Sequence, residues 1–290
     1  MSMAPAVATI MATTTSTDTV PPLLRLVWLA SPALPIGAFS YSEGLEAAVE
    51  HGHVHDDVSA GQWLSQQLAL LARGDMAAIA HGMQAWRDND EAALMALADW
   101  LRTTRDSAEA RLQSEQMGQS LLVWLRPQGM VSADQLTRLT RLCTPAGSLA
   151  CNPADRAAHN PPNSPPRSVP HSPLPSPSHG PLHSAPHGPP HSPHYALVIS
   201  LALSAIDVPI EQALQAQAFG WAENQVQAAL KAVPLGQTAG QRVLARLASE
   251  IPQAVATAIA TPPERRQLFA PMLSILAARH ETQYSRLFRS

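Results

Sequence analysis

The chain has 290 residues, a formal net charge of -3, 46% hydrophobic residues and 4% aromatic residues. A chain of this length and apolar content can bury a sizeable core, so we expect a folded globular protein. Lys231 is the single lysine. This composition argues against a surface for nucleic acid or anionic membrane, because such partners select clustered Lys and Arg.

The first twenty residues are rich in Ala and Thr and lack the basic start of a secretion signal, so we expect residues 1–20 to be disordered. Cys143 and Cys151 have no Cys-x-x-Cys spacing, which fits a reducing compartment and predicts a cytoplasmic protein. The longest uncharged apolar run, at 195–206, is about half the ~20 residues that a membrane-spanning helix needs. We therefore predict that the chain does not cross a membrane.

Apolar residues recur at helical spacing in most of the remaining chain. Ala and Leu dominate, and long stretches lack both Gly and Pro, which favours helices over sheets. The predicted helices lie at 23–30, 43–52, 59–86, 90–103, 107–126, 195–206, 210–233 and 237–251, followed by a C-terminal helical segment. The candidate N-caps are Ser42, Asp57, Asp88 and Ser107. The pattern predicts an all-α fold, a single compact multi-helix bundle with short connections.

Residues 151–194 break the helical pattern. They hold 14 of the 27 prolines and 7 of the 12 histidines. Proline removes amide donors, and too few large apolar groups remain to offset an ordering entropy of ~1 to 2 kcal/mol per residue. We therefore predict a disordered Pro/His/Ser-rich insertion, which separates two parts of the same domain at 21–150 and 195–290.

A rigid corner is predicted in the stretch ASPALPIGAFSYSEGLE, residues 30–46. Its prolines restrict the backbone, whereas Gly37 permits a positive φ. Phe39 and Tyr41 can then pack against the bundle while a serine caps the next helix. Two interpretations stay open, a well-packed turn and a corner that binds a partner. A nucleophilic serine is not indicated, because the stretch lacks a Gly-x-Ser-x-Gly elbow and a Ser-x-x-Lys pair.

Two later segments also allow two interpretations each. Asn224 and Gln225, in an Ala-rich helix, either cross-link helices or line a polar passage. The glycines of the following PLGQTAGQR have the wrong spacing for a phosphate loop, so nucleotide chemistry has to belong to a partner. In the tail RHETQYSRLFRS, Tyr284, Leu287 and Phe288 stand at i, i+3 and i+4. That spacing suits either an anchor in a partner's groove or a tail folded back on its own bundle.

Histidines raise the question of a metal site. His51, His53 and His55 alternate with other residues, and four histidines of the insertion recur at every fourth position. A spacing of four aligns ligands only on a helix, which the prolines of the insertion forbid, although a flexible run can still hold Ni²⁺ or Zn²⁺ weakly. Neither group has the acidic or cysteine residues of a closed site, so we assign no metal ligands.

Three of these segments, in this order, resemble the UreF family of urease accessory proteins. They are PALPIGAFSYSEGLE at 32–46, GWAENQVQAALKAVPLGQTAGQR at 220–242 and RHETQYSRLFRS at 279–290. With the intervening helices, the resemblance covers residues 22–146 and 195–290. The Pro/His/Ser-rich insertion departs from the family's usual pattern.

The resemblance implies a non-catalytic scaffold that acts in maturation of the nickel enzyme urease. Such a protein would form a homodimer, bind a UreD/UreH-type accessory protein, and recruit and regulate a UreG-type GTPase. The complex would deliver nickel to apo-urease, and this chain would hold no cofactor tightly. The residues expected to contact partners are Pro35, Gly37, Phe39, Ser40, Tyr41, Glu46, Tyr284, Arg286, Leu287 and Phe288.

Two other classes of protein are alternatives. The His-rich insertion would be the working part of a nickel-binding or nickel-storage protein. A helical hydrolase would need dispersed acid and base residues, for which Glu46, His81 and Glu281 are the candidates. Nothing in the sequence places these three side chains together.

Overall fold

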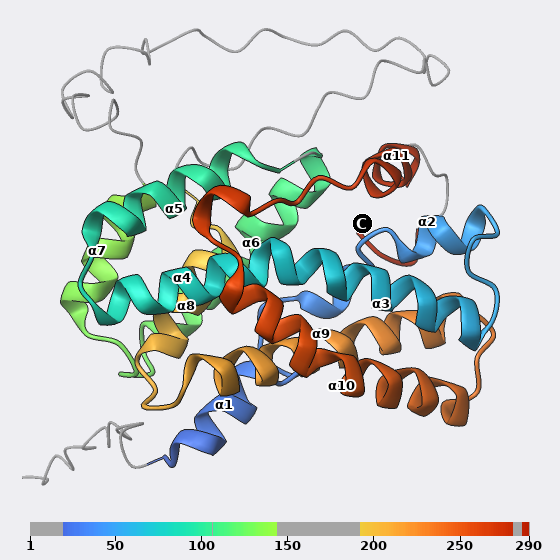
Figure 1. The fold of residues 1–290 in the computed structure, drawn as a ribbon, viewed down its shortest axis with the longest axis horizontal. Helices are drawn as coiled ribbons and strands as arrows, with labels where there is room; N and C mark the ends of the chain where they lie inside the picture. The colour runs from blue at the N-terminus through green and yellow to red at the C-terminus, as the bar shows by residue number, and fades with distance from the viewer. Residues whose placement is uncertain (1–19, 106, 144–191, 281–285, 290) are drawn as a thin grey trace, which may run out of the picture.

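The computed structural model of the chain describes residues 20–105, 107–143, 192–280 and 286–289. These residues form α-helices and two short 3-10 helices, with no β-strand among them, which confirms the all-α prediction (Figure 1). The elements are α1 (Pro22–Ala30), η2 (Ala38–Ser40), α2 (Leu45–Glu50), α3 (Asp57–Arg73), α4 (Asp75–Arg87), α5 (Glu91–Thr103), α6 (Ala108–Leu125), α7 (Ala133–Cys143), α8 (Tyr195–Ser204), α9 (Ile210–Ala232), α10 (Gln237–Ala260), η5 (Pro263–Arg265) and α11 (Pro271–His280). The predicted disordered N-terminus up to residue 19, and the predicted insertion up to residue 191, lie outside the described residues.

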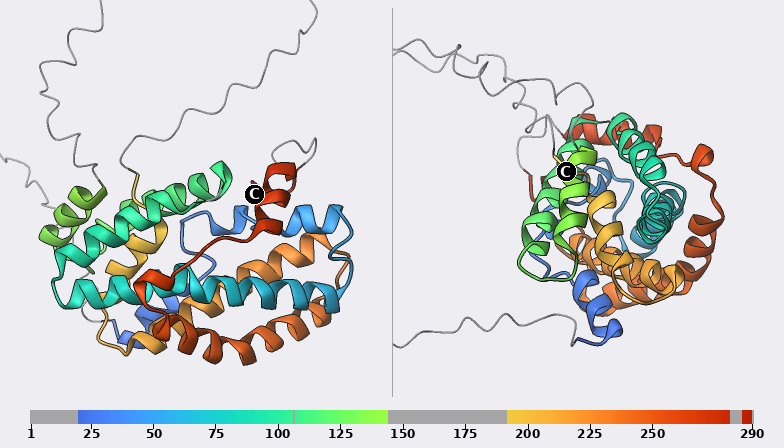
Figure 2. Two further views of the ribbon diagram at one scale, coloured as in Figure 1. Left: turned by 45° about the horizontal axis from the view of Figure 1, so that its top comes forward. Right: turned by 90° about the vertical axis from the view of Figure 1, so that its left-hand side faces the viewer.

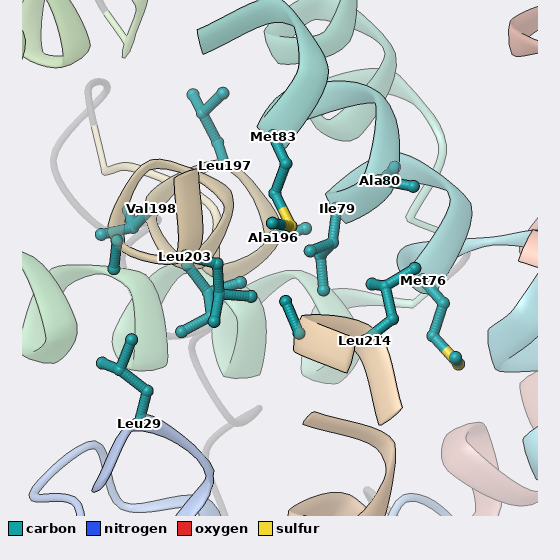
Figure 3. Packing of buried hydrophobic residues seen from close by; sticks show 14 of the residues in the cluster. Leu29, Met76, Ile79, Ala80, Met83, Ala196, Leu197, Val198, Leu203 and Leu214 are labelled. Atoms are coloured by element: carbon teal, nitrogen blue, oxygen red, sulfur yellow. The ribbon is translucent and has the colours of Figure 1, made fainter. Parts of the chain in front are cut away.

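Helix α8 is a buried helix of the core. Its residues from Ala196 to Leu203 are all buried, and it packs against α4 and α6. Figure 3 shows Leu197, Val198 and Leu203 of this helix among side chains of α4 and α9. The apolar run at 195–206 is therefore a core helix, and among the described residues no helix is both long and apolar enough to span a bilayer.

A second group of helices consists of α3, α9 and α10, with α10 packed against both of the others (Figure 1). At the contact between α9 and α10, a Cβ at Gly240 would lie 3.1 Å from Leu230 Cδ2, so the two helices approach closely at this glycine. Gly236 is the N-cap of α10. The segment PLGQTAGQR thus joins two helices.

The predicted helix at 59–86 is broken at Gly74, which ends α3 and precedes α4. The segment that links α10 to α11 crosses the molecule at this break (Figure 1). The Gln267 N–H donates to the Arg73 carbonyl at 3.1 Å, and a Cβ at Gly74 would overlap the Leu268 side chain. The helix prediction was wrong here because a distant segment occupies the site, which local periodicity does not reveal.

The structure corrects two of the four predicted N-caps and confirms a third. The fourth, Ser42, is not the N-cap of α2, which is Gly44, although its Oγ accepts from the Glu46 N–H at 3.3 Å. The side chain of Asp56, not that of Asp57, accepts from the backbone at the start of α3. Asp90 accepts from the Ala93 N–H at 2.9 Å and caps α5, whereas Asp88 follows the end of α4. Ser107 caps α6 as expected. In both corrected cases two acidic residues lie near the helix start, and sequence alone does not say which one precedes the first turn.

Two further helix boundaries differ from the prediction. Helix α10 continues through Pro252 to Ala260, although we expected its end at residue 251. Helix α7 was not predicted, although Leu136, Leu139 and Leu142 recur at every third position. Leu139 and Leu142 are buried, and the helix packs on α5. Burial raises the pKa of the Cys143 thiol, at the end of α7, to about 12.

Candidate partner-binding site at the corner and the C-terminal tail

The corner and the C-terminal tail lie against each other, although they are at opposite ends of the chain (Figure 2). Glu46, in the first turn of α2, is buried. Its Oε1 accepts from the Leu287 backbone N–H at 2.7 Å, and its Oε2 accepts from the Phe288 N–H at 3.0 Å. Hydrogen bonds to a carboxylate are stronger than those between neutral groups, so this side chain fixes the path of the tail.

The imidazole of His280 supports the same arrangement. Its Nε2 lies 3.2 Å from Glu46 Oε2, and its Nδ1 lies 3.3 Å from Glu109 Oε1. The side chain has no exposed surface and links the end of α11 to α2 and α6. Arg286 NH1 lies 3.5 Å from the same oxygen of Glu109, which brings a guanidinium charge to this side of the tail.

Phe288 anchors the tail in a small apolar cluster. Its side chain is only 6% exposed and packs in a cluster that includes Leu45, Ala48 and Leu276. Lys231 Nζ lies 5.8 Å from the centre of the ring. Burying a side chain of this size contributes ~1.5 to 3 kcal/mol. For residues 286–289 the structure thus has the tail folded back on its own bundle, in a non-helical conformation.

The end of the tail contacts the corner directly. The Arg289 N–H donates to the Ser40 carbonyl at 2.8 Å, and Arg289 NH1 lies 3.4 Å from Gln116 Oε1. The buried Tyr41 donates its hydroxyl to the same oxygen of Gln116 at 2.5 Å. Gly37 has φ +75°, which confirms the positive φ expected at the turn. The corner is therefore a tightly hydrogen-bonded turn.

The predicted contact residues fall into two groups by exposure. Glu46, Tyr41 and Phe288 are buried and hold the junction together. The side chains of Phe39 and Leu287 are 61% and 67% exposed. Others that reach solvent, wholly or in part, are Pro35, Gly37, Ser40 and Arg286. Tyr284 lies outside the described residues.

Glu43 is an important residue that the sequence analysis missed. It has φ +52°, which is uncommon for a residue other than glycine, and it precedes Gly44 at φ +83°. Its Oε2 accepts from Trp221 Nε1–H at 2.9 Å and its Oε1 from Gln113 Nε2 at 3.1 Å. Burial raises the pKa of the Glu43 carboxyl above its ordinary value. The two glutamates of the motif SEGLE thus face different ways, Glu43 to α6 and α9 and Glu46 to the tail.

One face of α9 carries polar side chains toward a cavity. Gln217 cross-links helices, because its Nε2 donates to the Leu29 carbonyl at 3.2 Å and its Oε1 accepts from the Tyr195 hydroxyl at 3.0 Å. Asn224 and Gln225, the pair singled out in the sequence, line the cavity. Of the two interpretations for Asn224 and Gln225, the structure supports the lining of a cavity, whereas the cross-link is made by Gln217, which also lines the cavity.

The described residues of the metal and hydrolase hypotheses are not assembled into a site. In the described part of the chain, no group of three or more His, Cys, Asp or Glu side chains is arranged to hold a metal ion. His51 Nδ1 lies 2.8 Å from the Ala47 carbonyl, and His81 interacts electrostatically with Arg266 and Glu264. Desolvation by burial lowers the pKa of His81. Glu281 and the histidines of the insertion up to residue 191 lie outside the described residues.

The fold and this junction define an all-helical protein in which a C-terminal tail completes one surface of the bundle. A family model, UreF, matches residues 54–248. The chain is 46% identical to "Urease accessory protein UreF" of Polaromonas sp. (strain JS666 / ATCC BAA-500), over 92% of this chain and 94% of that protein. The protein of the same name from Paracidovorax citrulli (strain AAC00-1) is 46% identical, over 92% of this chain and 89% of that protein. The one from Methylibium petroleiphilum (strain ATCC BAA-1232 / LMG 22953 / PM1) is 45% identical, over 92% of this chain and 94% of that protein.

The chain therefore belongs to the UreF family of urease accessory proteins. This confirms the resemblance seen in the three sequence segments. The family match begins at residue 54, so the corner that first indicated the family lies before the matched range.

Proposed function

We propose that this chain acts in the maturation of urease as a non-catalytic, cytoplasmic scaffold. It forms a homodimer, binds a UreD/UreH-type accessory protein, and recruits and regulates a UreG-type GTPase. The assembled complex inserts nickel into apo-urease, and nickel is handled by the complex with no cofactor held tightly by this chain. Membership in a family of urease accessory proteins supports the role in maturation.

The observation that supports the docking role is the construction of the junction between corner and tail. The hydrogen bond from the Arg289 N–H to the Ser40 carbonyl joins two segments. Each segment carries an exposed large apolar side chain, Phe39 on one and Leu287 on the other. Buried anchors hold the backbone of both segments, so a partner would meet these side chains with little ordering cost. Apolar anchors on a pre-organised backbone are typical centres of binding energy in protein interfaces.

Co-purification tests this proposal. The intact chain is expected to recover the UreD/UreH-type and UreG-type proteins of the same organism. The double variant Phe39→Ser, Leu287→Ser is expected to lower that recovery at least tenfold. Met95→Ser, which changes an exposed apolar residue on α5, is the matched control and should recover the partners normally.

Two results would count against parts of the proposal. If the intact chain joined neither partner, the scaffold role would be wrong. If the double variant recovered the partners as well as the Met95→Ser control did, the docking surface would lie elsewhere. Circular dichroism of each variant establishes that the helices are retained, so that a lost interaction reflects the surface and not the fold.

A further inference from the structure

A cavity of about 280 Å³ lies inside the bundle, between the corner, α3, α4, α6, α8, α9 and the segment leading into α11. This volume is close to the lower end of small-molecule sites, ~300 Å³. Much of the wall is apolar, with side chains from several helices. These include Leu70, Met76, Ile79, Met117 and Leu273.

Two residues of the wall, Gln225 and Arg105, carry buried polar atoms that have no hydrogen-bond partner within the described residues. Gln225 is 2% exposed, and its Oε1 has no hydrogen-bond partner there. The Arg105 Nε is likewise buried without an acceptor. An unpaired buried polar group costs ~1 to 3 kcal/mol, so a ligand that supplies a donor or an acceptor recovers part of this cost.

Among the described residues of the wall, the charged side chains already have partners. Arg105 forms a bidentate ion pair with Asp75, with distances of 2.7 and 3.0 Å. Glu109 lies against His280, and Glu43 accepts from two neutral donors. Burial also favours the uncharged form of Glu43 by raising its pKa. An ionised ligand would therefore lose its hydration without finding a free counter-charge, which is costly in an apolar interior.

We propose that this cavity binds a small uncharged molecule with an apolar body and a polar head that both donates and accepts hydrogen bonds, such as a primary amide or an alcohol. The apolar body lies against the leucine and methionine side chains, and the head donates to Gln225 Oε1. The site is separate from the docking surface at Phe39 and Leu287, and it requires no partner protein.

Three six-carbon probes test the charge preference on the unmodified chain: hexanamide, hexylammonium and hexanoate. We expect hexanamide to shift the indole N–H signal of Trp221 saturably in ¹H–¹⁵N spectra, because this side chain lines the cavity. Hexanamide should bind at least tenfold more tightly than either ionised probe. Absence of a saturable shift, or equal or tighter binding of an ionised probe, would overturn the proposal.

A pair of variants tests the polar contact. Gln225→Leu removes the unpartnered oxygen and keeps a side chain of similar size, and we expect it to weaken hexanamide binding at least tenfold. Gln227→Leu makes the same change at an exposed position of α9 and should leave binding unchanged. Hexanamide affinity that is the same in both variants would contradict the assigned contact. The probe comparison remains decisive if Gln225→Leu does not fold, because it uses the unmodified chain.

Discussion

Replacing Glu46 by alanine is expected to release the C-terminal tail from the bundle. The change removes the acceptor for the Leu287 and Phe288 N–H groups, at 2.7 and 3.0 Å, and the contact with His280 at 3.2 Å. A hydrogen bond to a charged group contributes ~1.5 to 3 kcal/mol, so two of them contribute ~3 to 6 kcal/mol before the released amides regain water. We take ~3 kcal/mol as the net loss.

A loss of this size corresponds to a roughly 100-fold increase in the opening equilibrium of the tail, since ~1.4 kcal/mol is a factor of ten. Hydrogen–deuterium exchange of the C-terminal peptide measures it directly. Glu46→Ala should raise the exchange rate of the Leu287 and Phe288 amides about 100-fold. Glu46→Gln keeps one acceptor oxygen and should raise the exchange rate of the same amides about tenfold.

The matched control is Glu50→Ala, which removes an exposed carboxylate at the end of the same helix. It should leave the exchange of both tail amides unchanged. The reasoning is refuted if Glu46→Ala exchanges these amides at the wild-type rate, because Glu46 would then not hold the tail.

Three further changes test other parts of the structure. Gly118→Ala places a Cβ that overlaps the Pro193 carbonyl oxygen and lies 2.8 Å from the His194 carbonyl carbon, so urea unfolding should show a loss of ~1 to 3 kcal/mol. Gly236→Ala has open space around the added Cβ and should cost less than ~1 kcal/mol. Asp90→Ala should lower the free energy of unfolding by ~1 kcal/mol through loss of the cap on α5, while a similar loss in Asp88→Ala would contradict the assignment of the cap. Burial lowers the pKa of His194 from 6.5 to about 4. Between pH 6.5 and pH 4 the unfolded chain therefore binds more protons than the folded chain. The free energy of unfolding should fall as the pH drops through this range, by up to ~3 kcal/mol. The variant His194→Gln should lack this part of the pH dependence; an unchanged slope in urea unfolding curves would show that another group is responsible.

The residue types of the candidate site were readable from the sequence, but their roles were not. Glu46 and Phe288 stood out as members of distinctive segments, yet both are buried and serve the junction between corner and tail. Their side chains meet across most of the chain length, and no periodicity reports such a contact. Glu43 gave a weaker signal, because its positive φ is unusual for a glutamate and only the adjacent Gly44 hints at a left-handed turn.

The sequence by itself determined the helical class, most helix positions and the family. These follow from local properties: Ala and Leu at helical spacing, prolines that stop helices, and strings of residues long enough to be specific. Tertiary structure alone decided the break at Gly74, where a distant segment needs the space of a side chain, and the docking of the tail on Glu46. It also decided that Gln217 of α9 cross-links helices and that Asn224 and Gln225 line the cavity. Such features depend on contacts between residues far apart in the chain, and these contacts exist only once the helices have packed.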